Sequence, residues 1–202
     1  VEKIHAAHEP VRIGIVGKYF GTGDYVLSDS YISVIEAIKH AAYSLDRKPE
    51  IHWINAEDFD PGANRASQEN LEKLKKYDGI IVPGGFGARG VEGKIAAIEF
   101  ARTNKILYFG LCYGMQLAVV EYARHVLGWS DAHTTEVLKK TQHPVIDIMP
   151  DQKKLMEDKN YGGTMRLGAY PAVRTGGTIA HEAYQAEEIS ARHRHRYEVN
   201  PE

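Results

Sequence analysis

The segment from Ile106 to Leu127 constrains the fold of this chain more than any other part of the sequence. An apolar run ends in Gly-Leu-Cys112-Tyr-Gly, and a helical pattern follows over residues 117–127. A glycine two residues either side of the central residue lets a strand and a helix approach closely around a strained turn, as in a nucleophile elbow. The segment therefore predicts a strand–turn–helix unit that exposes Cys112 at the turn.

Cys112 is the only cysteine in 202 residues, and the motif places it where an enzyme would expose a nucleophile. The expected helix begins beneath it, and the dipole and free amides of a helix N-terminus favour the thiolate, which attacks carbonyl groups. A buried core cysteine is the alternative, because free cysteine packs like a small hydrophobic residue. The two glycines and the change from strand to helix favour the nucleophile.

The composition excludes several classes of protein. A single cysteine rules out an intrachain disulfide framework and fits the reducing cytoplasm, where we expect the protein to be located. A net charge of −2 gives no field that recruits nucleic acid or anionic lipid, and no stretch reaches the roughly 18 apolar residues of a membrane span. We therefore expect no nucleic-acid partner and no membrane partner. Because the chain does not begin with methionine, we expect it to be a fragment of a longer protein.

Apolar strand patterns alternate with amphipathic helix patterns over the first two thirds of the chain. The expected strands are 11–16, 51–54, 79–83 and 106–110, and the expected helices are 28–45, 67–77 and 93–102. This alternation predicts an α/β fold with a mostly parallel central sheet and helices on both faces. Ligands bind such sheets beyond the carboxyl ends of the strands. The loop 84–90 and Cys112 both follow strands, so we expect them to face one crevice.

The alternation breaks down after about residue 130. Short strands are expected at 143–148, 164–167, 169–174 and 196–199, and the charged, turn-rich segment 150–163 is expected to be a surface excursion. No stretch has the composition of a linker that would divide the chain into two domains.

A glycine-rich loop follows the strand that ends at Val82, with the sequence Pro-Gly84-Gly85-Phe-Gly87-Ala-Arg-Gly. Three glycines in four positions let a backbone bend until its amides point into a cleft. One such amide, together with the amide of Tyr113, would form an oxyanion hole. A tight strand-to-helix turn that merely needs glycine is the alternative. The chain lacks the G-x-x-x-x-G-K-[ST] pattern of a nucleotide-binding loop.

Arginine and histidine alternate from Arg192 to Arg196. In a regular strand this spacing puts the three arginines on one face and the two histidines with Tyr197 on the other. The arginines could bind phosphate, clamp a carboxylate or line a solvated strand edge. His193 or His195 could serve as the base of a cysteine hydrolase, which spacing alone does not decide. No cysteine and histidine set has metal-ligand spacing, so we expect no metal site.

Four blocks of the sequence resemble one known family over the chain from about Val11 to its last residue. They are 17–37, 82–87, 110–116 and 192–200. In this order they are similar to the glutaminase domain of the CTP synthase family, which belongs to the class I (triad-type) glutamine amidotransferases. The resemblance implies the flavodoxin-like architecture of that class.

The resemblance also implies roles for individual residues. Cys112 would attack the side-chain amide of L-glutamine, release ammonia and leave a thioester for water to cleave. Gly85 and Tyr113 would supply the oxyanion amides, although the family usually has leucine at the position of Tyr113. Glu136 would hold the α-amino group of glutamine and Arg196 its α-carboxylate. The residues that would line the glutamine pocket are Gly85, Tyr113, Gly114, Met115 and Gln116.

In this family the ammonia aminates UTP to CTP with ATP. ATP, UTP and Mg are therefore expected only in an N-terminal synthetase domain of the same polypeptide, through which the family forms homo-oligomers. No cofactor is expected in this domain itself. The segment 89–92 resembles a lid linked to GTP, so the resemblance implies GTP as an allosteric activator.

One departure from the family concerns the general base. The family takes it from a later Phe-His-Pro-Glu-Phe segment, and this chain ends at Glu202 before such a segment. We therefore interpret residues 1–10 as the remnant of an interdomain linker and residues 11–202 as a glutaminase domain that lacks its C-terminal part. Losing the base costs orders of magnitude in rate, so we expect this chain alone to hydrolyse glutamine poorly.

Two alternatives remain open from the residues. The chain could be another cysteine hydrolase of the same sheet type, acting on a different amide or ester. It could also be a catalytically inactive binding module that keeps the fold.

Overall fold

The computed structural model describes residues 4, 7–18, 21–22, 25–26, 31–61, 66–149, 152 and 166–201. The chain forms two compact units, one of Val1–Ile146 with Val199–Glu202 and the other of Asp147–Glu198. Among the described residues, no helix combines the length and the apolar character needed to cross a bilayer. The expected domain boundaries at residues 10 and 11 stay a prediction.

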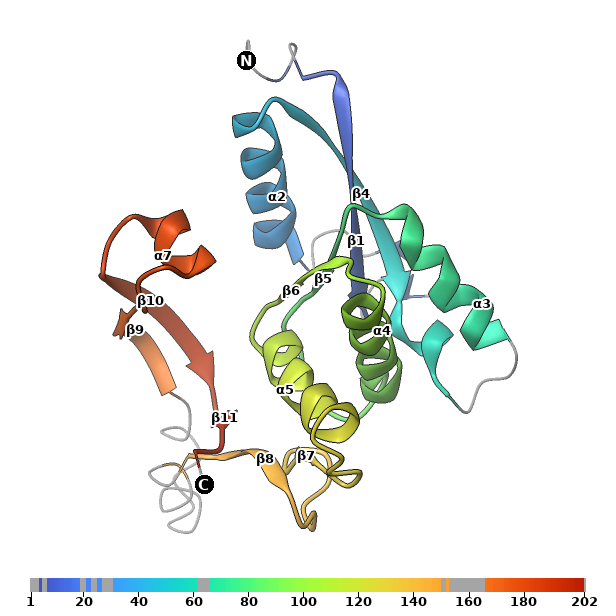
Figure 1. Ribbon diagram of the computed structural model, residues 1–202, viewed down its shortest axis with the longest axis vertical. Helices are drawn as coiled ribbons and strands as arrows, with labels where there is room; N and C mark the ends of the chain where they lie inside the picture. Colours follow the sequence, from blue (N-terminus) through green and yellow to red (C-terminus); the bar gives the residue numbers. More distant parts are fainter. Residues whose placement is uncertain are drawn as a thin grey trace. The chain divides into compact units, whose positions relative to one another are not determined.

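Four parallel strands form the central sheet of the first unit, in the order β4-β1-β5-β6 (Figure 1). They are β1 (Glu9–Gly17), β4 (Arg47–Asn55), β5 (Gly79–Val82) and β6 (Leu107–Gly110). The predicted parallel sheet is thus confirmed. Its register pairs Gly17 with Asn55 and Val82 with Gly110. The carboxyl ends of the strands therefore lie along one edge, which is where the predicted crevice requires them.

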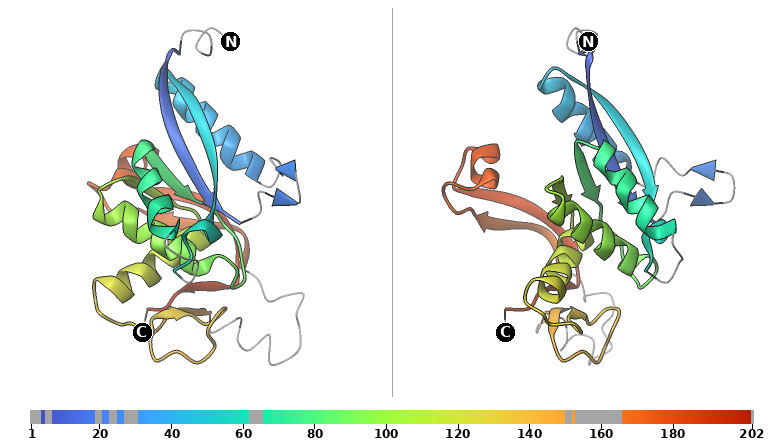
Figure 2. Two further views of the ribbon diagram at one scale, coloured as in Figure 1. Left: turned by 90° about the vertical axis from the view of Figure 1, so that its right-hand side faces the viewer. Right: turned by 45° about the vertical axis from the view of Figure 1, so that its right-hand side comes forward.

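Helices cover both faces of this sheet, as expected (Figure 2). The helix α2 (Ile32–Ser44) connects β1 to β4, and α4 (Val91–Thr103) connects β5 to β6. Because these two connections run in opposite directions along the sheet, right-handed crossovers place α2 and α4 on opposite faces. Helix α5 (Tyr113–His125) packs beside α4. The connection from β4 to β5 contains η2 (Ala56–Phe59), α3 (Ala66–Glu72) and η3 (Lys73–Lys76).

The core of the first unit lies between the sheet and these helices. Its fully or almost fully buried side chains include Ile15, Val16, Ile80, Val82, Ile95, Ala97, Leu117 and Val120. Burying such side chains stabilises a fold by about 25 cal/mol per Å² of apolar surface. The strand ends that carry the candidate site are therefore anchored in a packed core.

The second unit contains an antiparallel pair of strands. Strand β9 (Arg166–Val173) pairs with β10 (Glu188–His195), and the short helix α7 (Ile179–Tyr184) lies between them in the chain. Apart from this pair, a small three-stranded sheet has the order β11-β8-β7, where β7 is His133–Thr134, β8 is Pro144–Ile148 and β11 is Tyr197–Val199.

The first unit also contains a separate two-stranded sheet, in which β2 (Gly21–Thr22) pairs with β3 (Tyr25–Val26).

Several element boundaries differ from those expected. Strand β4 begins at Arg47, four residues before the expected start. The expected helix 67–77 is an α-helix only to Glu72 and continues as a 3₁₀ turn. Helix α5 begins directly after Cys112, as expected, but ends at His125 instead of at residue 127. The two strands expected around residues 164–174 form the single strand β9 over its described length. The expected excursion at 150–163 lies outside the described residues except for Gln152.

Candidate active site

Cys112 occupies the predicted turn between β6 and α5. Its backbone has φ 52° and ψ −105°, a conformation with positive φ that costs a residue with a side chain about 1–3 kcal/mol. Such strain persists where the surrounding structure imposes it, and here the turn holds an exposed cysteine at the edge of the sheet. The predicted strand–turn–helix unit is confirmed.

The two glycines of the motif are sterically required. A Cβ atom on Gly114 would lie 2.0 Å from the carbonyl oxygen of Val82, because α5 crosses β5 with almost no space between the backbones. A Cβ atom on Gly110 would lie 2.6 Å from the backbone nitrogen of Met115. Glycine at these two positions therefore lets the helix begin immediately behind the cysteine.

The glycine loop after β5 lies beside Cys112, as the sequence predicts. A Cβ atom on Gly84 would lie 3.6 Å from the Cβ of Cys112, and a Cβ atom on Gly85 would lie 3.7 Å from the ring of Tyr113. The backbone N–H of Leu111 donates to the carbonyl of Val82 at 2.9 Å, which ties the end of β6 to the end of β5. The two loops expected to supply oxyanion amides are thus neighbours.

Glu136 reaches the same loop from the segment after β7. Its Oε1 accepts a hydrogen bond from the backbone N–H of Gly87 at 2.8 Å. Its negative charge also acts on the Cys112 thiol and on Lys18. The acid predicted to hold the amino group of glutamine therefore lies near the nucleophile, while its role stays a prediction.

The surroundings of Cys112 act on the pKa of its thiol in opposite directions. Although the residue is exposed, its surroundings withdraw the sulfur partly from water, and this desolvation raises the pKa of the thiol above its ordinary value. The N–H of Tyr113 donates to the sulfur and lowers the pKa, while the charge of Glu136 raises it. The N–H at the helix N-terminus therefore favours the thiolate as expected, but desolvation outweighs its effect on the pKa.

Two lysines that the sequence analysis did not assign to the site lie against the glycine loop. Lys18 follows β1, is buried, and donates from Nζ to the carbonyl of Phe86. Lys94 of α4 is fully buried, and its Nζ lies 3.6 Å from the position of a Cβ on Gly85. Only the place of Lys18 directly after a strand could have indicated it, because a lysine inside a helix pattern is ordinarily solvated.

The other predicted pocket residues of α5 differ in exposure. Gly114 and Gln116 are buried, and the N–H of Gln116 donates to the carbonyl of Cys112 at 3.1 Å. Met115 is 43% exposed and borders an open, largely apolar groove of about 470 Å³ on α5. The predicted contacts of these residues with glutamine stay predictions.

Arg196 belongs to the second unit, at the bend between β10 and β11. In β10 the arginines are exposed and the histidines half-buried, which confirms the predicted alternation as far as His195. The regular strand ends there, so the alternation that would place Arg196 on the same face as Arg192 and Arg194 does not extend to Arg196. Its role as a carboxylate ligand stays a prediction.

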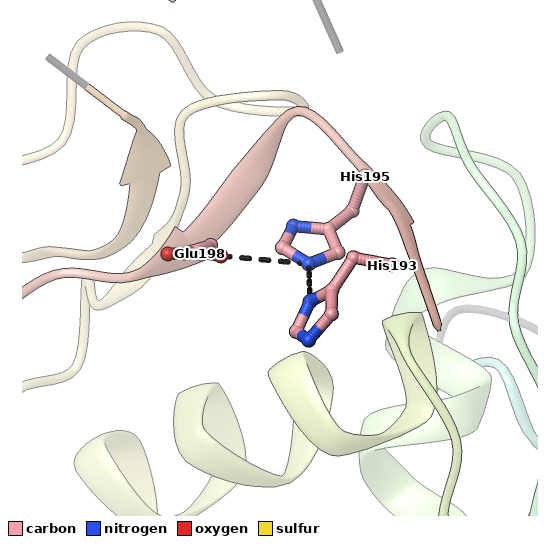
Figure 3. Close-up of side chains that lie close together, drawn as sticks. All are labelled: His193, His195 and Glu198. Atoms are coloured by element: carbon pink, nitrogen blue, oxygen red, sulfur yellow. Dashed lines mark hydrogen bonds and ion pairs between the residues drawn. The ribbon is translucent and has the colours of Figure 1, made fainter. Parts of the chain in front are cut away.

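His193, His195 and Glu198 of the second unit point toward one another (Figure 3). Imidazole and carboxylate groups are zinc ligands in proteins. Here, however, these groups already have protein partners. Nδ1 of His193 lies 2.7 Å from Nε2 of His195, and the carboxylate of Glu198 accepts a hydrogen bond from Arg166 at 2.6 Å. Burial lowers the pKa of His195. The charge of Glu198 raises this pKa, while those of His193 and Arg166 lower it further. The three possible metal ligands are thus engaged in hydrogen bonds and an ion pair.

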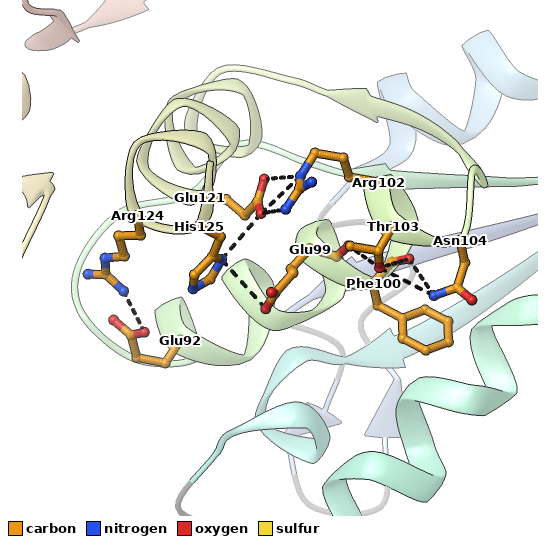
Figure 4. A network of polar contacts seen from close by, with 9 residues as sticks. All are labelled: Glu92, Glu99, Phe100, Arg102, Thr103, Asn104, Glu121, Arg124 and His125. Atoms are coloured by element: carbon orange, nitrogen blue, oxygen red, sulfur yellow. Dashed lines mark hydrogen bonds and ion pairs between the residues drawn. The ribbon is translucent and has the colours of Figure 1, made fainter. Parts of the chain in front are cut away.

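A second cluster lies between α4 and α5 and contains Glu99, Glu121 and His125 (Figure 4). The carboxylate of Glu121 is buried and accepts two-pronged hydrogen bonds from Arg102, the shortest at 2.7 Å. Nδ1 of His125 lies 3.2 Å from the same carboxylate. This network joins two helices, and its buried acid already has a cationic partner.

The family is settled by comparison with known proteins. The family model "Glutamine amidotransferase class-I" matches residues 26–202. An exposed cysteine on a strained strand-to-helix turn, next to a glycine loop, fits the chemistry of that family. The chain belongs to the class I glutamine amidotransferases.

The similar proteins are CTP synthases. The chain is 52% identical to the CTP synthase of Clostridium beijerinckii and 51% identical to that of Sulfurisphaera tokodaii, over 202 residues each. These matches cover 100% of this chain and 35–36% of the relatives, so the chain spans about a third of their length. The solved glutaminase domain of Trypanosoma brucei CTPS with bound acivicin is 40% identical, with a TM-score of 0.82 over 94% of this chain and 68% of that one.

Proposed function

We propose that this chain is the glutaminase domain of a CTP synthase, which hydrolyses L-glutamine to supply ammonia. The observation that carries the proposal is the strained, exposed Cys112 beside the Gly84–Gly87 loop, with Glu136 bonded to that loop. The identity of about 50% to CTP synthases supports it.

The reaction would begin with attack of the Cys112 sulfur on the amide carbon of glutamine. The carbonyl electrons move to oxygen, and the backbone amides of Gly85 and Tyr113 stabilise the resulting oxyanion. When the tetrahedral intermediate collapses, the C–N bond breaks and ammonia leaves with a proton. Water then cleaves the thioester to release glutamate. Because the free thiol has a raised pKa, a base must take its proton before the attack.

Glutamine would be held at its two charged ends. Glu136 offers a carboxylate for the α-ammonium group, and such charge-assisted hydrogen bonds are stronger than neutral ones. Arg196 offers a guanidinium that matches the α-carboxylate in two-pronged geometry.

The remaining partners are also part of this proposal. A synthetase domain of the same polypeptide would bind ATP, UTP and Mg, use the ammonia and form the homo-oligomer. GTP would activate through the segment Arg89–Glu92. In this structure Arg89 bonds to Glu57 at 2.6 and 2.8 Å, so movement of the segment would require breaking that exposed ion pair.

Covalent labelling tests the proposed function. A chloroketone analogue of glutamine should alkylate Cys112, with chloride as the leaving group, and mass spectrometry of the digested protein should locate one label there. L-Glutamine should protect Cys112, whereas D-glutamine should not. Cys112→Ala should take no label.

Removal of the acidic partner tests the substrate orientation in the same assay. Glu136→Gln should raise the L-glutamine concentration needed for half protection by about tenfold, since a charge-assisted bond is lost. The control Glu69→Gln removes an exposed carboxylate of α3 and should leave protection unchanged. Labelling of Cys112 that L-glutamine does not slow would overturn the proposed function.

A further inference from the structure

Gly87 is fixed at both of its peptide groups. Its N–H donates to Glu136 at 2.8 Å, and its carbonyl accepts a hydrogen bond from the hydroxyl of Tyr113 at 3.0 Å. Its φ of +74° is a value that glycine adopts without strain. Without such contacts a loop with three glycines in four positions would sample many conformations. The side chains of Glu136 and Tyr113 therefore fix the position of Gly87, the last glycine of the Gly84–Gly87 loop.

Tyr113 touches this loop with its side chain while its backbone belongs to the nucleophile turn. It is the first residue of α5, and its N–H donates to the Cys112 sulfur. Its ring is 1% exposed and packs near Gly85, with the Nζ of Lys94 at 5.5 Å from the ring centroid. A single residue therefore connects the two segments that would carry the oxyanion amides.

The geometry points to Tyr113 as a positioning residue whose hydroxyl holds the Gly84–Gly87 loop at the distance from Cys112 that a tetrahedral intermediate requires. This inference rests on the proposed function. Preorganised donors stabilise a developing oxyanion because they need no rearrangement during the reaction. A leucine at position 113 would supply the same backbone amide but would have no hydroxyl for Gly87. The bond to Gly87 therefore depends on the tyrosine side chain.

The test uses Tyr113→Phe and an aldehyde analogue of glutamine, glutamate γ-semialdehyde. The Cys112 sulfur adds to the aldehyde carbon, one C–S bond forms, and the carbonyl oxygen takes the electron pair and then the thiol proton. The adduct thus places an oxygen where the oxyanion would lie. Its dissociation constant is measured by calorimetry, and a ¹³C label at the aldehyde carbon identifies the tetrahedral adduct by NMR. Hydration and cyclisation of the aldehyde are the same for every variant, so ratios of dissociation constants are unaffected.

Tyr113→Phe should weaken the aldehyde adduct about 3- to 10-fold, as expected for one lost hydrogen bond. Binding of L-glutamine itself should change less than twofold, and the rate of Cys112 alkylation by iodoacetamide, which needs no oxyanion donor, should stay the same. Tyr113→Leu should show the same selective loss. Tyr122→Phe is the matched control, because it removes a half-exposed hydroxyl from the same helix and should alter none of the three measurements.

The outcomes separate this inference from the proposed function. If folded Tyr113→Phe binds the aldehyde as tightly as the unaltered chain, the inference is overturned and the function stands. If glutamine and aldehyde binding fall equally, Tyr113 supports the pocket in general, and the positioning role is again overturned. If the unaltered chain forms no aldehyde adduct and binds no glutamine, both the proposed function and this inference are overturned.

Discussion

The environment of Lys94 opposes the chemical preference of its side chain. The side chain is fully buried in α4, and its Nζ has no hydrogen-bond partner among the described residues. Burial and the neighbouring charge of Lys18 lower the pKa of Lys94 to about 8. Burying a charged ammonium without a partner costs free energy, so this lysine lowers stability at neutral pH. Its Nζ lies close to Gly85, whose backbone amide is predicted to stabilise an oxyanion.

The lowered pKa of Lys94 predicts how the stability of the chain depends on pH. Because Lys94 releases its proton more readily in the folded than in the unfolded chain, its cost is full below about pH 8 and disappears as pH approaches 10.5. Lys94→Met should therefore raise the free energy of unfolding by about 3 kcal/mol at pH 7, an upper value from the pKa shift. The gain should shrink between pH 8 and 10.5, as measured by urea unfolding at several pH values.

The exposed Lys140 provides the control for that series. Lys140→Met should change stability by less than about 0.5 kcal/mol across the same pH range. A Lys94→Met effect that does not vary with pH would contradict the assignment of a buried charge.

Some single-residue roles could be predicted from the sequence, and others could not. Cys112 was identifiable because a local pattern of glycines surrounds it. The bonds from Glu136 and from the Tyr113 hydroxyl to Gly87 join residues 49 and 26 positions apart, and no local pattern encodes such contacts. The direction of the Cys112 pKa was also missed, since desolvation depends on everything packed around the sulfur.

At the scale of elements, the nucleophile turn depends on the close crossing of α5 over β5. The crossing leaves no room for a side chain at Gly114, where a Cβ atom would meet the Val82 carbonyl. A backbone atom cannot move aside as a flexible side chain can. The position of Cys112 is therefore coupled to how closely the helix packs on the sheet.

A methyl group at this crossing should separate the two elements. Gly114→Ala should lower the free energy of unfolding by at least about 2 kcal/mol, because overpacking of this kind forces the backbone to shift. The same variant should slow labelling of Cys112 by the chloroketone. Gly176→Ala is the control, since nothing lies within 4 Å of its added Cβ, and it should be nearly neutral. Equal stability of the two variants would show that the crossing is not tight.

The elements themselves were predictable to different degrees. The parallel strands β1, β5 and β6 have continuous apolar runs, so their locations follow from the sequence. The start of strand β4 could not be predicted, because its first residues lack an apolar pattern. Polar residues are possible there because β4 is an edge strand of the sheet. The alternation over the second half of β10 was predicted, but the start of the strand at Glu188 was not, since its first residues form no strong apolar face.

At the scale of the whole molecule, the outer edge of the central sheet has an unusual surface. Strand β6 is the last strand in the sheet order, and Leu107 and Phe109 are 75% and 61% exposed. An exposed apolar strand edge is a template for pairing with another chain. From the described part of the chain, we therefore expect the β6 edge of the first unit to promote association.

Charge on this edge should suppress association. Leu107→Lys should lower the apparent mass of the chain at concentrations of tens of micromolar, measured by light scattering after size exclusion, with little change in the free energy of unfolding. Leu45→Lys, which alters an exposed leucine after α2 and away from the edge, should have no such effect. If both variants associate like the unaltered chain, the β6 edge does not drive self-association.

The raised pKa of the Cys112 thiol has a consequence for oxidative damage. Peroxides react with thiolates far faster than with thiols, and repeated oxidation of a cysteine becomes irreversible. The raised pKa lowers the thiolate fraction of this exposed sulfur, so we expect it to react slowly with hydrogen peroxide. We therefore expect the one thiol of this chain to resist irreversible oxidation as long as it remains protonated.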